Sequence, residues 1–274
     1  MTGPSLTVLM TVYHGTTATH ISQALESLYD QTRPAEEILL IQDGPIGEDV
    51  AAILSTAEAT RPEVRVLRRE KNEGNAVATA AGFATLTTEF YARQDSDDIS
   101  YPERFERQLA FLAEHPRVDL VGSAMTEFVH SPDEPVGVRT LPESPAEINR
   151  YLTINNPINH PTIMARVEAI REVGGYQPVH LMEDYDLMAR LVAGDKVLAN
   201  MPEQLVYFRV GEEQLSRRTG LDMIRAELSM QRNLVDYGTV GAFRAVGNFL
   251  LRSLYRLLPK RLLGRVYRLL FHRR

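Results

Sequence analysis

Acidic side chains gather in one short stretch of the chain, Asp95-Ser96-Asp97-Asp98. Two carboxylates one residue apart, directly after an apolar run, can converge on one hard divalent cation. Mg²⁺ and Mn²⁺ favour oxygen ligands and take water or phosphate oxygens as the rest of their shell. A diphosphate leaving group needs such a cation to neutralise its developing charge. Asp95 and Asp97 are therefore the best ligand candidates, with Asp98 as a supporting group.

The same stretch also has a plainer interpretation, a solvated acidic turn that caps the helix expected after Pro102. Two other interpretations fail on the residues present. A calcium-binding EF-hand loop needs an oxygen ligand at its fifth position and glycine at its sixth, where the chain has Ile99 and Ser100. A dinucleotide-binding motif needs G-x-G-x-x-G after the first strand, where the chain has Tyr13-His14-Gly15-Thr16-Thr17.

Alternating strand and helix patterns are expected to position these carboxylates. Continuous apolar runs predict buried strands at residues 6–12, 38–41, 64–67, 90–93 and 118–121. Helical spacing predicts helices at residues 21–29, 50–59, 75–85 and 103–115. This alternation predicts a mostly parallel, doubly wound sheet, in which ligands bind beyond the carboxyl ends of the strands. Polar residues follow three of those ends, at Tyr13-His14, Asp43 and Asp95–Asp98.

Past about residue 130 the pattern becomes less regular. Prolines at positions 132, 135, 142 and 145 predict a loop-rich crossing. Short strands are expected at residues 163–164, 197–198 and 205–210, around a helix at about 184–192.

Charge is distributed unevenly along the chain. The 274 residues include 30 basic and 36 acidic side chains, a net of −6, yet nine basic residues and no acidic one follow Asp236. Residues 1–236 therefore hold 21 basic and 36 acidic side chains, a net of −15. An acidic body joined to a basic tail argues against a nucleic-acid binder. Cysteine is absent, which removes disulfides and thiolate zinc sites and fits a reducing cytoplasm.

The basic tail has two apolar stripes at helical spacing, separated by Pro259. The first comprises Leu250, Leu251, Leu254, Leu257 and Leu258, and the second Leu262, Leu263, Val266, Leu269 and Leu270. Helices with such stripes and basic opposite faces lie in the membrane interface, where anionic lipid adds roughly 1 kcal/mol per basic residue. Packing on the acidic body or on a second subunit is the alternative. Without a signal peptide or a run of 18 apolar residues, we expect a cytoplasmic protein peripheral to the inner face of the membrane.

Several segments, in order along residues 5–235, resemble glycosyltransferase family 2 enzymes with the GT-A fold. They are LTVLMTVYHG, EEILLIQDGP, NEGNAVATAAGF, RQDSDDISYPERFERQLAFL, NHPTIM, GGY and EDYDLMARL. The similarity is strongest to the exopolysaccharide and lipopolysaccharide branch that includes amylovoran-biosynthesis transferases, where FRVG and a downstream RR-x-G also occur.

This resemblance implies a GT-A domain over residues 1–235, with a nucleotide-binding half at about 1–125 and an acceptor half at about 126–235. A basic amphipathic helical tail follows at 236–274. The implied reaction is inverting transfer of a sugar from a nucleotide-diphosphate sugar, expected to be UDP-linked, to a hydroxyl of a surface-glycan acceptor, expected to be lipid-linked. The implied cofactor is Mn²⁺ or Mg²⁺.

Carried over position by position, the resemblance assigns the donor site. Residues beside the nucleotide are Thr11, Tyr13, Asp43 and Ser96, and residues shaping the pocket floor are Asn72, Gly74 and Asn75. Asp95 and Asp97 hold the metal and the diphosphate. Asp43 has an alternative role as an ordinary turn residue before Gly44-Pro45.

The resemblance also assigns the acceptor side. Asp184 is the general base, with Glu183 beside it, because an acceptor hydroxyl is too weak a nucleophile unless a carboxylate takes its proton. The alternative is that both acids only favour the positive N-terminal end of a helix, and Asp186 is expected to be structural. Weaker assignments, to acceptor contacts or a closing loop, are His160, Arg209, Arg217 and Arg218.

One departure from the family pattern concerns the metal. Many relatives supply a third ligand from a histidine about two residues after the arginine of the last strand, where this chain has Arg209-Val210-Gly211. In this chain, either water and the nucleotide complete the metal's coordination shell, or Glu212 or Glu213 takes the place of the histidine. Two other functions stay open: a sugar nucleotidyltransferase, although Tyr13–Thr17 lacks the basic loop it would need, and a non-catalytic nucleotide-sugar-binding scaffold at the membrane.

Overall fold

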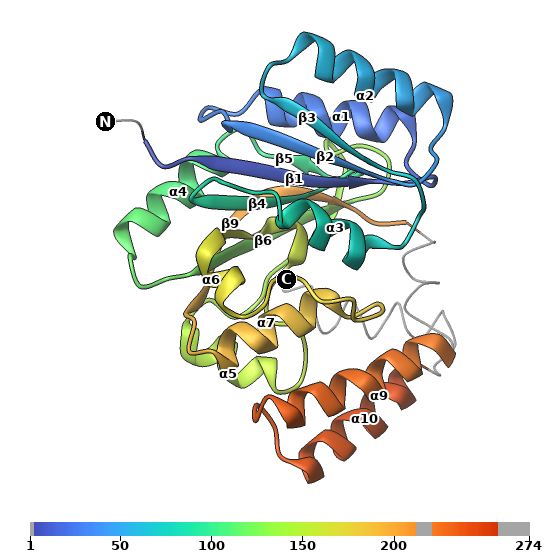
Figure 1. Ribbon diagram of the computed structural model, residues 1–274. Coiled ribbons are helices and arrows are strands. Elements are labelled where there is room, and N and C mark those ends of the chain that lie inside the picture. The colour runs from blue at the N-terminus through green and yellow to red at the C-terminus, as the bar shows by residue number, and fades with distance from the viewer. Residues whose placement is uncertain (1–2, 212–220, 257–274) are drawn as a thin grey trace.

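The computed structural model describes residues 3–211 and 221–256, and within them a nine-stranded sheet forms the centre of the molecule (Figure 1). The strand order is β3-β2-β1-β4-β8-β6-β9-β5, and β7 pairs with β6. The strands are β1 (Leu6–Val12), β2 (Glu37–Asp43), β3 (Val64–Arg69), β4 (Phe90–Asp95), β5 (Ile99–Ser100), β6 (Leu120–Phe128), β7 (Pro135–Arg139), β8 (Met164–Arg166) and β9 (Leu198–Arg209).

Helices cover both faces of this sheet. They are α1 (Ala18–Tyr29), α2 (Glu48–Thr60), α3 (Asn75–Phe83), α4 (Arg104–Glu114), α5 (Pro145–Leu152), α6 (Val167–Glu172), α7 (Glu183–Ala193), α9 (Leu221–Asp236) and α10 (Ala242–Arg256), with a 3-10 turn η1 at His160–Thr162. Alternate residues of β1 divide between two cores, since side chains of a strand point to opposite faces. Val8 and Met10 pack with α1, α2 and α4, whereas Leu9 packs with α3, α5 and α7.

The first half of the sheet is parallel, as predicted. β1 pairs in parallel with β2 and β4, and β2 with β3. The register places Thr11 opposite Asp95 and Asp43 opposite Arg69, at the carboxyl ends of their strands. Parallel neighbours therefore bring the polar strand ends to one edge of the sheet, the edge at which ligands are expected to bind.

The second half of the sheet is mixed. β8 is antiparallel to both β4 and β6, β5 is antiparallel to β9, and β6 runs parallel to β9. The two short strands expected at 197–198 and 205–210 are one strand, β9, which stays paired through irregularities opposite Ser123–Met125. The proline-rich crossing contains β7 and also α5, which opens with a Ser144–Glu147 capping box.

Helices α9 and α10 form a pair at the opposite end of the molecule from α2 (Figure 1). Helix α10 carries the beginning of the predicted tail, and Leu257 and Leu258 of the first apolar stripe, with the whole second stripe, lie outside the described residues. Large apolar side chains of α10 stay exposed: Phe243 at 97%, Val246 at 58%, Leu250 at 62%, Leu251 at 64% and Leu254 at 64%. We call these residues the apolar stripe of α10. Among the described residues, no helix combines the length and apolar character needed to span a membrane.

Candidate active site

A buried arginine fixes Asp95 at the end of β4. The guanidinium of Arg93 donates from Nε to Asp95 Oδ1 over 2.8 Å and from Nη1 to Thr79 Oγ1 over 2.9 Å. Its Nη2 donates to Thr11 Oγ1, also over 2.9 Å. Burial alone would raise the pKa of Asp95, but the neighbouring Arg93 guanidinium lowers that pKa below its ordinary value. Asp95 is therefore an ionised carboxylate at the sheet edge, with 29% of its side chain exposed.

The residues Asp95-Ser96-Asp97-Asp98, which we call the acidic turn, are anchored by the end of β9. The backbone amide of Arg209 donates to Asp98 Oδ1 over 2.9 Å, and Arg209 Nε donates to the carbonyl of Asp97 over 3.0 Å. Asp98 is fully buried, and its Oδ2 makes no hydrogen bond within the described part of the chain. Burial, followed by the charges of Asp97 and Asp95, raises the pKa of Asp98 well above its ordinary value. Asp98 therefore holds the turn together.

Asp95 and Asp97 are the carboxylates of this turn that keep solvent contact, because Asp97 is half-buried. Their oxygen donors suit Mg²⁺ or Mn²⁺, which accept water and phosphate oxygens as the remaining ligands. Across residues 3–211 and 221–256, no three histidine, aspartate or glutamate side chains come together as a preformed cation site. The proposed substitutes for a third ligand, Glu212 and Glu213, lie outside the described residues.

The loop after β1 lies against the acidic turn. Thr16 Oγ1 is 3.2 Å from Ser96 Oγ and accepts a hydrogen bond of 3.2 Å from the amide of Tyr13. The ring of His14 meets the ring of Tyr13 edge-on at 5.2 Å. A side chain at Gly15 would come within 2.6 Å of the Tyr13 ring, so glycine is needed for this ring position. The residues that follow β1 and β4 thus lie side by side.

Asp43, at the end of β2, organises the segment that precedes α3. Its Oδ1 accepts from the amide of Glu73 at 3.1 Å and from Arg69 Nη1 at 3.1 Å, and its Oδ2 accepts from the amide of Gly74 at 2.9 Å. Its carbonyl accepts from Asn72 Nδ2 at 3.1 Å. Asp43 is only 2% exposed, and these hydrogen bonds give it a structural role in fixing the backbone before α3. A nucleoside contact by Asp43 stays a prediction.

Asn75 connects these strand ends to the first turn of α7. Its Oδ1 accepts from Thr11 Oγ1 at 2.8 Å and from Arg93 Nη2 at 3.0 Å. Its Nδ2 donates to Glu183 Oε1 at 2.8 Å. Burial, followed by the charge of Asp184, raises the pKa of Glu183, and the hydrogen bond from Asn75 partly opposes this rise. The first turn of α7 is thereby tied to the acidic turn through Arg93.

Asp184, also in the first turn of α7, is half-buried. Its Oδ2 accepts a hydrogen bond of 2.9 Å from Asn156 Nδ2, and its Oδ1 accepts from the amide of Tyr185. The expected structural role of Asp186 is confirmed. Asp186 is fully buried, and its carboxylate is bound by Arg190, Asn233 and Tyr237.

The residues with weaker assignments have different surroundings in the structure. His160 Nε2 lies 3.0 Å from the hydroxyl of Tyr176, which is 2.7 Å from the hydroxyl of Tyr91. Burial and the charge of Arg93 lower the pKa of His160, which favours the neutral imidazole. Arg209 binds the acidic turn, donates from Nη2 to Gln23 Oε1 and lies 4.5 Å from the centre of the Phe128 ring. Arg217 and Arg218 lie outside the described residues.

Sequence reasoning missed Arg93 and Asn156. Arg93 had a signal, because a charged residue inside an otherwise apolar strand must find partners when that strand is buried. Asn156 had none, since Asn155-Asn156-Pro157 resembles any turn.

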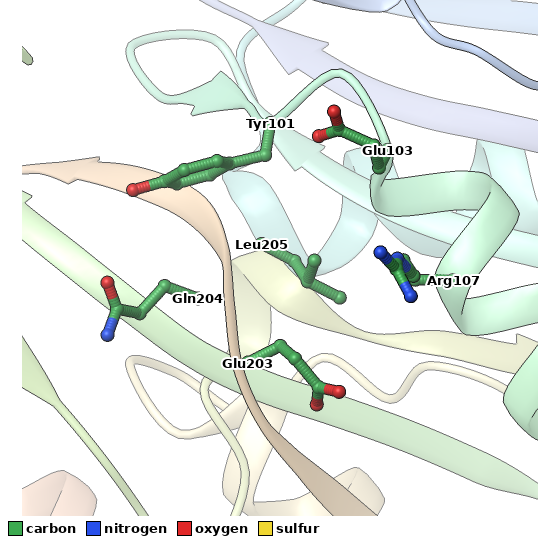
Figure 2. A pocket seen from close by; sticks show the side chains of 6 residues that line it. All are labelled: Tyr101, Glu103, Arg107, Glu203, Gln204 and Leu205. Carbon is green, nitrogen blue, oxygen red and sulfur yellow. The ribbon is translucent and has the colours of Figure 1, made fainter.

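A separate open hollow of about 290 Å³ lies between the start of α4 and β9 (Figure 2). Its lining residues are Tyr101, Glu103, Arg107, Glu203, Gln204 and Leu205. None of them belongs to the acidic turn or to α7, so this hollow is distinct from the candidate site.

Comparisons with known proteins place this geometry in context. The family described as Glycosyl transferase family 2 matches residues 7–174. Amylovoran biosynthesis glycosyltransferase AmsE of Erwinia amylovora is 34% identical over 260 residues, covering 95% of this chain and 97% of that protein. UDP-Gal:alpha-D-GlcNAc-diphosphoundecaprenol beta-1,3-galactosyltransferase of Escherichia coli is 28% identical over 270 residues, covering 98% of each.

Solved structures show the same fold. S. aureus TarS 1–349 in complex with UDP-GlcNAc superposes with a TM-score of 0.70 at 17% identity, covering 91% of this chain and 72% of that one. Mannosyltransferase PcManGT from Pyrobaculum calidifontis, in complex with GDP-Man and Mn²⁺, superposes with a TM-score of 0.63 at 14% identity, covering 97% and 80%. The GT-A architecture predicted from the sequence is confirmed.

Proposed function

The chain belongs to glycosyl transferase family 2, and we propose that it is an inverting, metal-dependent enzyme of the hexosyltransferase type. It transfers a sugar from a UDP-sugar to a hydroxyl of a lipid-linked surface glycan. The observation that carries this proposal is the hydrogen-bonded connection between its two reactive ends. Arg93 binds Asp95 on the donor side, and Asn75 bridges Arg93 to Glu183, the neighbour of Asp184.

The donor side is formed by the strand ends. When bound, Mn²⁺ or Mg²⁺ supplies the positive charge that stabilises the departing diphosphate, and Asp95 and Asp97 are the residues that hold it. Arg93 keeps Asp95 ionised and fixed in direction before any substrate binds. Such preorganisation avoids reorientation during the reaction. The nucleotide lies along Thr11, Tyr13, Asp43, Asn72, Gly74, Asn75 and Ser96.

The acceptor side is formed by the first turn of α7. Asp184 accepts the proton of the acceptor hydroxyl while the hydroxyl oxygen bonds to the anomeric carbon of the donor. The bond from that carbon to the diphosphate breaks in the same step, so the configuration inverts. Asn156 holds one Asp184 oxygen, which limits the directions from which the acceptor hydroxyl approaches. We also propose that His160 contacts the acceptor and that Arg209 supports the acidic turn. Arg217 and Arg218, which lie outside the described residues, are proposed to belong to a closing loop.

The substrate class follows from the relatives. The E. coli relative, similar across 98% of both chains, is named for a UDP-galactose donor and a diphosphoundecaprenol-linked acceptor. The TarS structure contains UDP-GlcNAc. Two other relatives are named for amylovoran biosynthesis and for O-antigen biosynthesis. These names support a UDP-linked donor and a lipid-linked glycan for this chain.

Attachment to the inner face of the cell membrane fits such an acceptor. The apolar stripe of α10 is exposed, and the chain beyond Asp236 carries basic but no acidic residues. An apolar face with basic flanks binds anionic lipid surfaces. We therefore place α10 on the membrane, at the level of a lipid-linked acceptor.

The test is an assay of the full chain with Mn²⁺, UDP-galactose or UDP-N-acetylglucosamine, and N-acetylglucosamine-diphosphoundecaprenol. Release of UDP with a product of inverted anomeric configuration, seen by NMR, supports the proposal. A product of retained configuration contradicts it. Pyrophosphate release from UTP and a sugar 1-phosphate would identify a nucleotidyltransferase. UDP-sugar binding without any turnover, even with other acceptors, would point to a non-catalytic scaffold.

A further inference from the structure

The inner face of α10 binds the turn that follows α5. Asn248 Nδ2 donates to the carbonyl of Thr153 over 2.7 Å, and Arg252 Nη1 donates to the carbonyl of Ile154 over 2.7 Å. Thr153 is the C-cap of α5 and Ile154 follows it, so these two carbonyls lie at and beyond the helix end, where the helix itself supplies no donor. Two side chains one turn apart on α10 therefore bind the backbone of this turn.

Arg252 also contacts α9. Its Nε lies 2.8 Å from Glu227 Oε2, and Glu227 is fully buried in α9. Gln231 Nε2 donates to Glu227 Oε1 over 2.9 Å, which fixes that carboxylate. Arg252 Nη1 also donates to Asn155 Oδ1 over 2.8 Å, and its guanidinium lies 5.7 Å from the centre of the Tyr185 ring. The guanidinium thus connects α9 with the turn after α5.

That turn leads directly to the carboxylate proposed as the general base. Asn156 Oδ1 accepts from the amide of Ile158 over 3.2 Å, which fixes the direction of the Asn156 side-chain amide. The Nδ2 of Asn156 therefore faces Asp184 and donates to its Oδ2 over 2.9 Å. The path from α10 to Asp184 consists of Arg252, the turn at residues 153–156, and the side chain of Asn156.

We propose that α10 positions the general base, with Arg252 as the positioning residue that acts on Asp184 through Asn156. This inference rests on the proposed function, in which Asp184 accepts the acceptor proton. A base must lie within hydrogen-bond reach of its proton, and a displacement of about 1 Å can lower turnover on the order of 100-fold. Helix α10 thus has two roles: its outer face carries the apolar stripe, and its inner face sets the direction of Asp184.

The experiment uses the full chain and four substitutions, one of which, Asp184→Asn, tests the base itself. Arg252→Lys keeps a positive charge beside Glu227 but loses the planar fork, so it spares the fold better than Arg252→Ala, which leaves a buried carboxylate unpaired. Asn156→Ala removes the last link to Asp184. Arg232→Lys makes the same chemical change at an exposed position of α9 and is the matched control. The readouts are kcat and donor KM with UDP-galactose or UDP-N-acetylglucosamine and the diphosphoundecaprenol-linked acceptor, and hydrogen–deuterium exchange of residues 152–158.

Arg252→Lys is expected to lower kcat about tenfold or more, with donor KM within about twofold and faster exchange at residues 152–158. The double variant with Asn156→Ala is expected to lose no more than Asn156→Ala alone, within about twofold, because both changes act on one path. Normal kcat in Arg252→Lys, unchanged exchange, or losses that multiply in the double variant overturn the inference while Asp184→Asn stays inactive. Retained turnover in Asp184→Asn overturns the proposed function itself.

Discussion

Asn75 and Glu183, the first residues of α3 and α7, are joined by a hydrogen bond of 2.8 Å across 108 positions of sequence. The same Asn75 side chain accepts hydrogen bonds from Thr11 and Arg93. One amide therefore fixes the distance between the strand ends that we propose bind the donor and the helix start that contains Asp184. The carboxyl ends of β1 and β4 and the start of α7 are joined here.

Replacement of Asp97 by asparagine tests the metal site. Asparagine keeps the size of the side chain but removes the charge that attracts a hard cation. We expect Asp97→Asn to lower kcat on the order of 100-fold, because charge stabilisation by a bound cation contributes several kcal/mol. UDP affinity in Mn²⁺, measured by calorimetry, should fall as well. Asp133→Asn, at an exposed position, is the control. Full activity of the wild-type chain in EDTA would contradict a metal requirement.

Two glycines with positive φ, Gly44 and Gly74, allow backbone strain to be measured with and without a steric clash. Gly44 has φ +80, and a Cβ there would come within 2.4 Å of the backbone nitrogen of Asn72. Gly74 has φ +91, and a Cβ there would meet nothing within 4 Å. Gly74→Ala should cost about 1–3 kcal/mol of unfolding free energy from backbone strain alone. Gly44→Ala should cost more in urea denaturation, since the backbone must also move. Equal costs would show that the Gly44–Asn72 contact is unimportant.

Alkaline pH should weaken the fold through Tyr91. Burial raises the pKa of Tyr91 to about 12, against an ordinary value of 10.0. The folded chain therefore binds more protons between these two pH values, and the unfolding free energy falls as pH rises through that window. The fully buried Tyr91 contributes about 3 kcal/mol to this fall. Urea denaturation from pH 8 upward measures it, and Tyr91→Phe should flatten the slope. An unchanged slope in Tyr91→Phe would refute this assignment.

The apolar stripe of α10 predicts lipid binding. A charge on this stripe, as in Leu250→Glu, should reduce co-flotation of the full chain with vesicles containing phosphatidylglycerol, because burying an unpaired carboxylate in the lipid interface is unfavourable. Val136→Glu, at a similarly exposed apolar position on β7, should float like the wild-type chain. Flotation that is equal for both variants would favour the alternative, in which α10 packs on a partner subunit.

Much of the donor half was predictable from the sequence because its signals are local. The apolar run at residues 6–12 is β1, and the run at 90–93 begins β4, which continues to Asp95. A strand buried on both faces has a continuous apolar pattern, and the polar residue that follows marks its carboxyl end. The position of the acidic turn at the sheet edge followed from that pattern alone.

The acceptor half was less predictable, because its order depends on contacts distant in sequence. Exposed residues at Pro202–Gln204 interrupt the apolar pattern of β9, so one long strand resembled two short ones. Its pairing with β6 continues through irregularities that no local pattern indicates. Likewise, the sequence shows that an acidic residue, Asp43, follows a predicted strand. It does not indicate that the Asp43 oxygens bind the backbone amides of Glu73 and Gly74.

The central claim is that Asp184 removes the acceptor proton, and one substitution tests it most directly. Asp184→Asn keeps a side chain that can meet Asn156 but cannot accept a proton at neutral pH. UDP affinity in Mn²⁺ should stay within about twofold, since Asp184 is on the acceptor side, while transfer to the lipid-linked acceptor falls at least about 100-fold. Transfer by Asp184→Asn at a rate near that of the wild-type chain, with UDP bound normally, would contradict the account.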